Sequence, residues 1–218
     1  MWVAAKHVSN VATAEREVAA LKLACKFDVP RVVQLKGDLQ HPTNGRVLIL
    51  EMLEGMTMAQ YLLHHAEHSW ACREERTLGT AAQLMETLCK LHNSANLAHL
   101  DIKPPNMMLI RKPQNKWDTI RLVDGGLAQA LEPGNGNLAF AMGASVNVAS
   151  PEVLFARHLA DHCGRDVLKV DGAAADQWSA GTTLFVMLTG DFPFLMSNQP
   201  YTRDTWRDAL QAQRSWVR

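Results

Sequence analysis

The chain has 218 residues, of which 47% are hydrophobic, and its 22 lysines and arginines are balanced by 22 aspartates and glutamates. This length fits one large domain or two small lobes, and the balanced charge excludes a strongly basic nucleic-acid-binding tail. No apolar run reaches the length of a membrane span, and no signal-peptide core is present. The four cysteines form no C-x-x-C pair, so we expect buried free thiols and a cytoplasmic or nuclear location.

The first quarter of the chain reads as a small sheet with one helix. An apolar strand ends on Lys6, and a stripe at helical spacing predicts a helix over Thr13–Lys26. Two more strands are predicted at Val32–Leu39 and Arg46–Met52, joined by a turn that contains proline and glycine. Taken alone, Lys6 is more often a solvated charge at a strand end, and Glu17 is as often an ordinary surface glutamate.

Two helices are predicted in the middle of the chain. The first spans Thr57–His68, with Thr57 at its N-cap. Three of its histidines have a spacing that could bind a metal, but no cysteine or carboxylate cluster supports this, which favours a solvated helix face. The second helix spans Arg76–Ser94. The residues expected on its buried apolar side are Leu78, Ala82, Met85, Leu88, Cys89 and Leu91.

The stretch His99–Leu109 crowds polar groups into a short loop that runs into an apolar strand. Two adjacent prolines forbid a continuous helix, and Met107–Ile110 reads as a short buried strand. Asp101 could accept a hydroxyl proton, and Lys103 could lie against a phosphate. Asn106 could coordinate Mg²⁺, which prefers hard oxygen ligands.

A second carboxylate favours a metal–phosphate site. Residues 119–123 look like a returning strand, which delivers Asp124 followed by two glycines. A hairpin would place Asn106 and Asp124 side by side. Asp101 or Asn106 alone is more often a capping or turn residue, but the combination with Asp124 favours chemistry.

The last third of the chain is predicted to be mainly helical. Residues 127–150 form a loop-rich segment, and residues 157–175 are expected to be an inserted loop of unknown role. A strongly apolar helix is predicted at Trp178–Leu188, followed by a final amphipathic helix at Arg203–Val217.

Four motifs in order resemble those of eukaryotic protein kinases. The family pattern is H-R-D-L-K-x-x-N, followed by D-F-G, A-P-E and D-x-W-S-x-G. The resemblance covers nearly the whole chain, and a lysine two residues after the aspartate of the first motif resembles the serine/threonine branch. The matching residues are His99-Leu100-Asp101-Ile102-Lys103-Pro104-Pro105-Asn106, Asp124-Gly125-Gly126, Ser150-Pro151-Glu152 and Asp176-Gln177-Trp178-Ser179-Ala180-Gly181.

The resemblance implies an α+β, two-lobed fold. Residues 1–53 would form a partial N-lobe of three strands and one helix, and residues 54–218 a mainly helical C-lobe that lacks its last helices. The implied activity is transfer of the ATP γ-phosphate to a serine or threonine of a protein substrate, with Mg²⁺. Nothing implies a nucleic-acid partner or a membrane span, and the oligomeric state stays open.

The resemblance also assigns roles. Asp101 would position and deprotonate the hydroxyl, and Lys103 would stabilise the transferring phosphate, with Ser145 contacting both. Lys6 would orient the nucleotide, paired with Glu17, or less well with Glu15. Leu50 would be the gatekeeper, and the backbone of Glu51 and Leu53 would bind adenine. The full set expected to bind the nucleotide is Ala4, Lys6, Leu50, Glu51, Leu53 and Met108, and the expected metal ligands are Asn106 and Asp124.

Three departures from the family matter, and the first of them favours a second hypothesis. No Gly-rich loop precedes Lys6, Leu100 replaces an arginine that can pair with a phosphorylated segment, and Gly125 replaces a phenylalanine. The alternative is a catalytically weak kinase-like binding module, or a fragment of a larger kinase. The 218-residue form is expected to bind Mg·ATP weakly and to phosphorylate poorly, because the phosphates lack a cover of backbone N–H groups.

Overall fold

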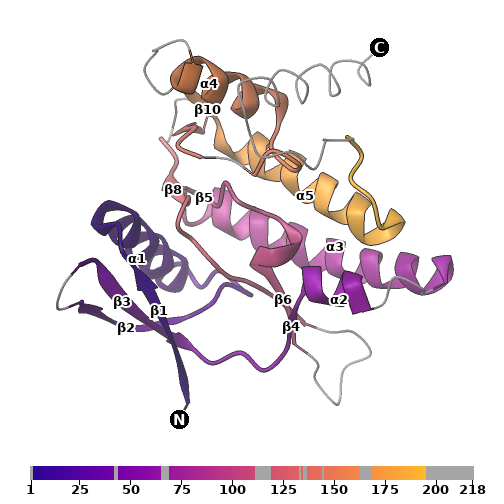
Figure 1. Cartoon of the computed structure of the whole chain (residues 1–218), viewed down its shortest axis with the longest axis horizontal. Coiled ribbons are helices and arrows are strands. Elements are labelled where there is room, and N and C mark those ends of the chain that lie inside the picture. The colour runs from indigo at the N-terminus through magenta and orange to yellow at the C-terminus, as the bar shows by residue number, and fades with distance from the viewer. Residues whose placement is uncertain are drawn as a thin grey trace.

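The computed structural model describes residues 2–41, 44–64, 69–110, 119–132, 134, 137–143, 145–162 and 168–194. These residues form a small antiparallel sheet with one helix, followed by a larger, mainly helical part (Figure 1). The α+β fold expected from the sequence is therefore confirmed. The elements of the first part are β1 (Val3–Val8), α1 (Val11–Lys26), β2 (Leu35–Gln40) and β3 (Arg46–Glu51).

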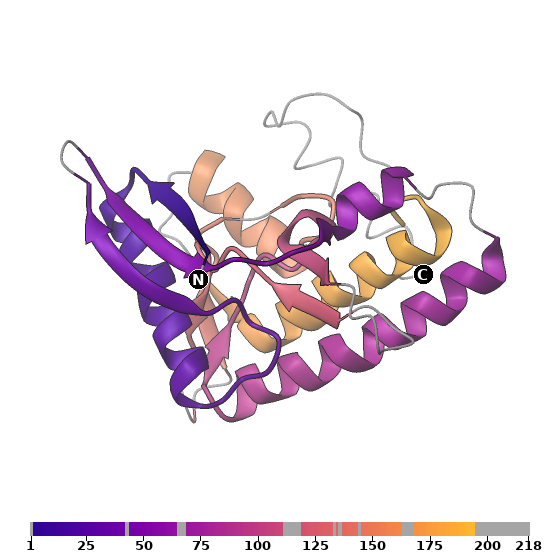
Figure 2. The same ribbon diagram turned by 90° about the horizontal axis from the view of Figure 1, so that it is seen from below.

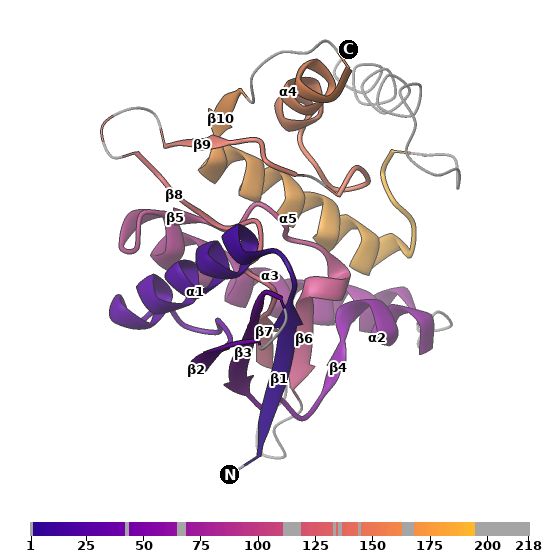
Figure 3. The same cartoon turned by 60° about the vertical axis from the view of Figure 1, so that its left-hand side comes forward.

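The sheet of the first part has the order β1-β3-β2, with both pairs antiparallel. Helix α1 begins two residues before the predicted start, because the side chain of Asn10 accepts a hydrogen bond from the Thr13 N–H at 2.9 Å. Its buried face packs on the sheet (Figure 3), which fixes β1 beside α1. The buried residues of this core are Ala14, Val18, Leu21, Val33, Leu48 and Leu50.

The larger part is built around two long helices. Helices α3 and α5 lie side by side along its centre (Figures 1 and 2). Several short strands pack against these two helices. The helices are α2 (Met58–His64), α3 (Trp70–Asn93), α4 (Pro151–His162) and α5 (Gly172–Thr189). The strands are β4 (Met56–Thr57), β5 (Leu97–Ala98), β6 (Met107–Ile110), β7 (Thr119–Leu122), β8 (Gln129–Ala130), β9 (Leu138–Phe140) and β10 (Lys169–Asp171).

The inserted loop expected at residues 157–175 is wrong for its described residues. Helix α4 continues to His162, and β10 and the start of α5 occupy residues 169–175. The side chain of Asp171 accepts a hydrogen bond from the Ala174 N–H at 2.9 Å, so it caps α5 well before the predicted start at Trp178. Gly190 ends α5 with a φ of 89°, a backbone conformation that glycine adopts without strain.

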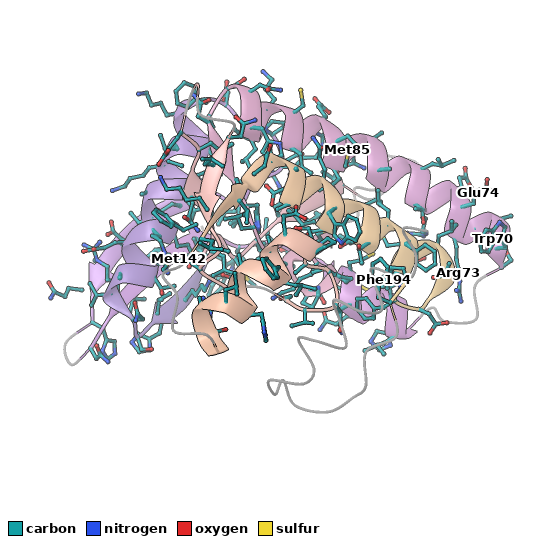
Figure 4. All side chains as sticks on the ribbon, turned by 90° about the horizontal axis from the view of Figure 1, so that it is seen from above. Trp70, Arg73, Glu74, Met85, Met142 and Phe194 are labelled. Atoms are coloured by element: carbon teal, nitrogen blue, oxygen red, sulfur yellow. The ribbon has the colours of Figure 1, made fainter. Side chains whose placement is uncertain are left out.

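The buried face predicted for α3 is partly wrong. The helix starts at Trp70, capped by Ser69, and four side chains that were expected to be buried, Leu78, Ala82, Met85 and Cys89, are exposed. Figure 4 shows Trp70 and Met85 on the outer side of the helix. The buried face includes three threonines instead; its members are Thr77, Thr80, Leu84, Thr87, Leu88, Leu91 and His92.

Other sequence expectations meet the structure only in part. Cys25 and Cys89 are exposed and Cys72 is intermediate, so the expected burial of the thiols is wrong for the described cysteines. Helix α2 is present up to His64, whereas residues 65–68 and the helix predicted at Arg203–Val217 lie outside the described residues. Within the described part of the chain, no helix is both long and apolar enough to cross a membrane. The lobe boundary after residue 53 stays a prediction.

Candidate active site

The β6–β7 hairpin brings the predicted metal ligands to one end of the same sheet. Strands β6 and β7 pair antiparallel, with Met107 opposite Leu122. One residue beyond this pair, the Val123 N–H donates to the Asn106 carbonyl at 3.0 Å. Asn106 closes η1 (Pro104–Asn106), a single 3₁₀ turn whose prolines prevent a longer helix. The hairpin therefore places Asn106 directly before one strand and Asp124 shortly after the other.

Lys6 joins two carboxylates from distant parts of the chain. Its Nζ donates to both carboxylate oxygens of Glu17, at 2.8 and 2.9 Å, and to Oδ1 of Asp124 at 2.8 Å. The Glu17 side chain is 1% exposed, whereas those of Lys6 and Asp124 are 32% and 46% exposed. A buried carboxylate thus holds the lysine in place, and a more accessible carboxylate lies on its open side.

The surroundings shift the pKa values of two groups in this cluster. Burial on its own would lower the pKa of Lys6, but its hydrogen bonds to Asp124 and Glu17 and their negative charges raise this pKa overall. Burial would likewise raise the pKa of Asp124, but the hydrogen bond and charge of Lys6 outweigh it. With a smaller contribution from the Gly126 N–H, they hold the pKa of Asp124 below its usual value. Both groups are charged at neutral pH.

A second network surrounds Asp101. Its Oδ1 accepts a hydrogen bond from the Ser145 hydroxyl at 2.8 Å, and its Oδ2 lies 2.8 Å from the ammonium of Lys103. Lys103 also donates to the Ser145 hydroxyl oxygen at 2.8 Å, which closes a three-membered ring of contacts. The amide of Asn106 donates to Oδ2 of Asp101 at 2.7 Å and to its backbone carbonyl at 3.0 Å. Asp101 is 8% exposed and is therefore held in one orientation.

Asp176 holds the loop that carries Asp101, a role that the sequence did not suggest. The carboxylate is fully buried in α5 and accepts hydrogen bonds from the backbone N–H groups of His99 and Leu100, at 2.8 and 2.7 Å. It also lies 2.9 Å from Nε2 of His92 in α3. Leu100 has a φ of 61°, which is uncommon for a leucine, and the bond to Asp176 offsets part of that strain.

The residues expected around adenine come from three strands. Ala4 on β1 lies opposite Leu50 on β3, which is buried in the core of the first part, and Leu53 packs on the same core. The Glu51 N–H donates to the Gln34 carbonyl at 2.9 Å, so this N–H is already used within the protein. Met108 is half-buried between β4 and β7. Ala4 thus lies two residues before Lys6 on β1, and Leu50 and Glu51 lie on the paired strand β3, while the role of all these residues stays a prediction.

The space beside Gly125 is mostly filled by neighbouring side chains. A Cβ placed there would lie 3.7 Å from Cγ of Glu17 and 3.9 Å from the Cβ atoms of Ala20 and Ala128, which are ordinary contact distances. The cavity that remains next to Gly125 and His99 is about 20 Å³, far smaller than a phenylalanine side chain.

Leu100 is part of the packing that anchors the 127–150 segment. Its side chain packs against two apolar clusters, whose buried members include Ala139 and Val146. An arginine in this position would bring a charge into apolar surroundings. The segment is therefore anchored here by apolar burial, where the family uses a cation.

Strand pairing and hydrogen bonds from two side chains hold a later part of the same segment. Strand β9 pairs with β10, and the side-chain amide of Gln129 bonds both the N–H and the carbonyl of Phe140. Arg157 of α4 donates to the carbonyls of Ala141 and Met142, at 3.4 and 3.2 Å. These contacts hold described residues of the segment against α4 and β10.

The histidine-based metal site considered for the helix at 57–68 is not tested, because the histidines at positions 65 and 68 lie outside the described residues. The set proposed for Mg²⁺ is of another kind, because it has one carboxylate and one carboxamide and would share the ion with phosphate oxygens.

Comparison with known proteins gives a consistent result. Residues 2–215 match the family model described as "Protein kinase domain". The chain is 30% identical over 183 residues to the probable serine/threonine-protein kinase HSL1 of Saccharomyces cerevisiae, which covers 83% of this chain and 10% of that protein. It is 25% identical over 195 residues to the serine/threonine-protein kinase RAD53 of the same yeast, covering 89% of this chain and 22% of that protein.

A mammalian relative extends the comparison. The sperm motility kinase 2B of Mus musculus is 28% identical over 178 residues, which are 81% of this chain and 32% of that protein. The chain therefore spans at most about a third of the length of these relatives. Because the family model covers nearly all of its residues, this chain belongs to the protein kinase family.

Proposed function

We propose that this chain is a protein serine/threonine kinase, which transfers the γ-phosphate of ATP to a serine or threonine hydroxyl of a protein. The observation that carries the proposal is the position of Asn106. Its side-chain amide donates to Asp101, and its backbone carbonyl accepts from Val123, next to Asp124. One residue thus connects the network suited to a hydroxyl with the network suited to a metal and phosphates.

Asp101 is the group proposed to act on the acceptor hydroxyl. In the structure, Oδ1 of Asp101 already accepts a hydrogen bond from a hydroxyl, that of Ser145, at 2.8 Å. A substrate hydroxyl in a similar position would be oriented by this carboxylate and could pass its proton to it. Lys103, 2.8 Å from the same carboxylate, supplies positive charge where the phosphate would arrive.

The open side of the Lys6 cluster is suited to a metal-bound triphosphate. Asp124 and the Oδ1 oxygen of Asn106 are hard ligands of the kind that Mg²⁺ prefers, and the Asn106 amide is already used by Asp101. When bound, the ion would neutralise charge that develops on the phosphates. Lys6 has a fixed partner in Glu17, so its ammonium can turn from Asp124 to a phosphate without losing its position.

The serine/threonine branch is the finer part of the proposal. It rests on Lys103 two residues after Asp101 and on the names of the relatives, which are serine/threonine kinases in the two yeast cases. The alternative, a kinase-like module that binds nucleotide with little turnover, shares the Lys6 cluster but needs no function for Asp101. The two therefore differ in what a change at Asp101 should do.

The test is Asp101→Asn, compared with wild type for both phosphotransfer and Mg·ATP binding. We expect turnover to fall about 10²–10⁴-fold, the usual contribution of a general base, while nucleotide affinity changes little. Leu78→Asn, on the exposed side of α3, is a matched control that should change neither quantity. Equal turnover in wild type and Asp101→Asn would remove Asp101 from the mechanism, and nucleotide binding without any turnover would favour the binding module.

A further inference from the structure

Helix α3 has apolar side chains on two faces. On the buried face, Leu84, Leu88 and Leu91 pack into the core of the larger part. A second set, the α3 stripe, lies on the exposed face. Its members, spaced four, three and four residues apart, are Leu78, Ala82, Met85 and Cys89. This spacing keeps all four on one side of the helix. A helix at the surface of a globular chain needs only one apolar face, so the fold of a single chain leaves the α3 stripe without a role.

The α3 stripe lies at the edge of the molecule. Helix α3 runs along one edge in two opposite views (Figures 2 and 4), and Leu78 and Met85 are 65% and 41% exposed. The buried face of the helix carries His92, whose Nε2 lies 2.9 Å from the Asp176 carboxylate. A partner on the stripe would therefore remove apolar surface from water without entering the site around Asp101.

The two ends of the α3 stripe carry opposite charges. Glu74 and Glu75 are exposed about one turn before Leu78. Lys90 is exposed directly after Cys89. The exposed face of α3 is therefore negative near its start and positive near its end.

The other charged side chains around the stripe leave this pattern in place. Arg73 donates to a backbone carbonyl at the end of α5 at 3.1 Å, and Arg76 lies over the ring of Tyr61 in α2. Both arginines are thus on the side of α3 that faces α2 and α5. Glu86, which follows Met85 in the chain, pairs with Arg31 at 2.8 Å, so its charge is balanced within the same chain.

Antiparallel pairing of two copies would match both the apolar and the charged residues. Glu74 and Lys90 each lie eight positions from Ala82, which has the smallest side chain of the stripe. If a two-fold axis passes beside Ala82, the negative end of each α3 lies level with the positive end of the other. Leu78 of one copy then lies close to Met85 of the other, and the small alanines let the helices approach closely. A parallel pairing would place like charges together at both ends, which is unfavourable.

We propose that the α3 stripe is the interface of a dimer, in which two copies of this chain pair through antiparallel α3 helices around a two-fold axis beside Ala82. Four side chains bury less than the roughly 800 Å² that each partner contributes to a standard interface, so the dimer should be weak and reversible. The inference concerns assembly, and it goes beyond the proposed function without depending on it.

The first test measures association of the 218-residue chain by sedimentation equilibrium over a wide range of protein concentrations. We expect a monomer–dimer equilibrium that weakens as salt is added, because salt screens the charges at the two ends. Ala82→Glu places two carboxylates together at the axis and should weaken the dimer by about tenfold or more. Ala19→Glu, at an exposed alanine of α1, is the matched control and should associate as wild type does. Glutamate is a good helix former, so both variants should keep the wild-type melting temperature.

Exchange of the end charges tests the direction of pairing. Glu74→Lys alone and Lys90→Glu alone should each weaken the dimer about two- to fivefold, because each brings like charges to the same level. The double variant should restore wild-type association, since opposite charges then meet again at both ends.

Cross-linking tests the position of the axis. Mild oxidation of Ala82→Cys should give a disulfide-linked dimer, because the two introduced thiols adjoin the axis. The Cys89 residues of the two copies would be about 20 Å apart at the helical rise of 1.5 Å per residue, so the wild-type chain should form no bond through Cys89. Mass spectrometry of the cross-linked peptides identifies which cysteine reacted.

Three results would overturn the inference. One is a well-folded chain that stays monomeric at every concentration, in which case another segment of this chain or a different protein would cover the stripe. The others are a dimer that survives Ala82→Glu and a wild-type cross-link through Cys89. These measurements use no nucleotide, so their failure would leave the proposed kinase function untouched.

Discussion

Filling the space beside Gly125 gives a sharp test of the packing described for the site. In the family this position carries phenylalanine, so restoring the ring could be expected to stabilise the fold. The structure predicts the opposite, because the remaining cavity is about 20 Å³ and Glu17, Ala20 and Ala128 line the rest of the space. A ring in Gly125→Phe would have to displace Glu17, the residue that holds Lys6.

The magnitude follows from the geometry. Overfilling a closed core costs about 1–3 kcal/mol, and each kcal/mol moves the melting temperature of a chain of this size by about 2–4 °C. We therefore expect Gly125→Phe to melt about 2–12 °C below wild type. In Gly125→Ala, by contrast, the Cβ would make contacts of 3.7 to 3.9 Å, so this variant should be neutral or more stable by up to about 1 kcal/mol.

The assay is differential scanning fluorimetry of the three proteins, with Mg·ATP titrated by calorimetry. The displaced Glu17 should also weaken nucleotide binding in Gly125→Phe, while Gly125→Ala should bind as wild type does. A higher melting temperature in Gly125→Phe would refute the reasoning, since it would show that the space beside His99 is open.

Three further outcomes are expected. Asp124→Asn should lower the melting temperature at neutral pH, because the folded chain lowers the pKa of Asp124 and its carboxylate therefore stabilises the fold above its usual pKa of 3.8. In melts at decreasing pH, the melting temperatures of variant and wild type should converge as the pH falls through the folded-state pKa. Phosphatase treatment should leave activity unchanged, since Arg157 and apolar packing hold the 127–150 segment; a loss traced to dephosphorylation there would contradict this. Asp176→Asn should lower the free energy of unfolding by about 3 kcal/mol in urea titrations, because it removes a buried charged acceptor.

The sequence predicted the contacts of the site best where short-range chemistry determines them. Asn106 and Asp124 were expected side by side because a hairpin with apolar strands has few alternatives, and their backbones do meet through Val123. Glu17 was assigned from the family resemblance, since the residues alone left an ordinary surface glutamate equally open, and the structure buries it on α1. A residue pattern predicts the structure well where neighbouring residues alone determine the local fold.

Long-range and packing effects were less accessible. The partners of Asp176 are backbone N–H groups at positions 99 and 100, more than 70 residues earlier, and no side-chain pattern marks them. On α3, hydrophobicity placed Leu78 inside. The core accepts Thr87 instead, because its hydroxyl bonds the Gln83 carbonyl within the same helix at 2.8 Å.

The 157–175 stretch was misjudged for a related reason. It mixes charged and small residues and lacks the strongly apolar character of the helix that follows, so a loop was predicted. Ala173 and Ala175 are nevertheless buried in α5, where small side chains allow close packing against neighbouring elements. Asp171, which caps the N-terminus of α5, directly precedes this run of small residues and could have indicated where the helix begins.

The most direct measurement of the central claim follows the label from nucleotide to peptide. The chain is incubated with Mg²⁺, a mixture of serine peptides, and ATP labelled at either the γ- or the α-phosphate, with Asp101→Asn in parallel. The site described here predicts labelled phosphoserine only from γ-labelled ATP and wild-type chain, and loss of the label on chelation of the metal. Nucleotide binding by a well-folded wild-type chain without any transfer of the γ-label, or equal transfer by Asp101→Asn, would contradict the claim.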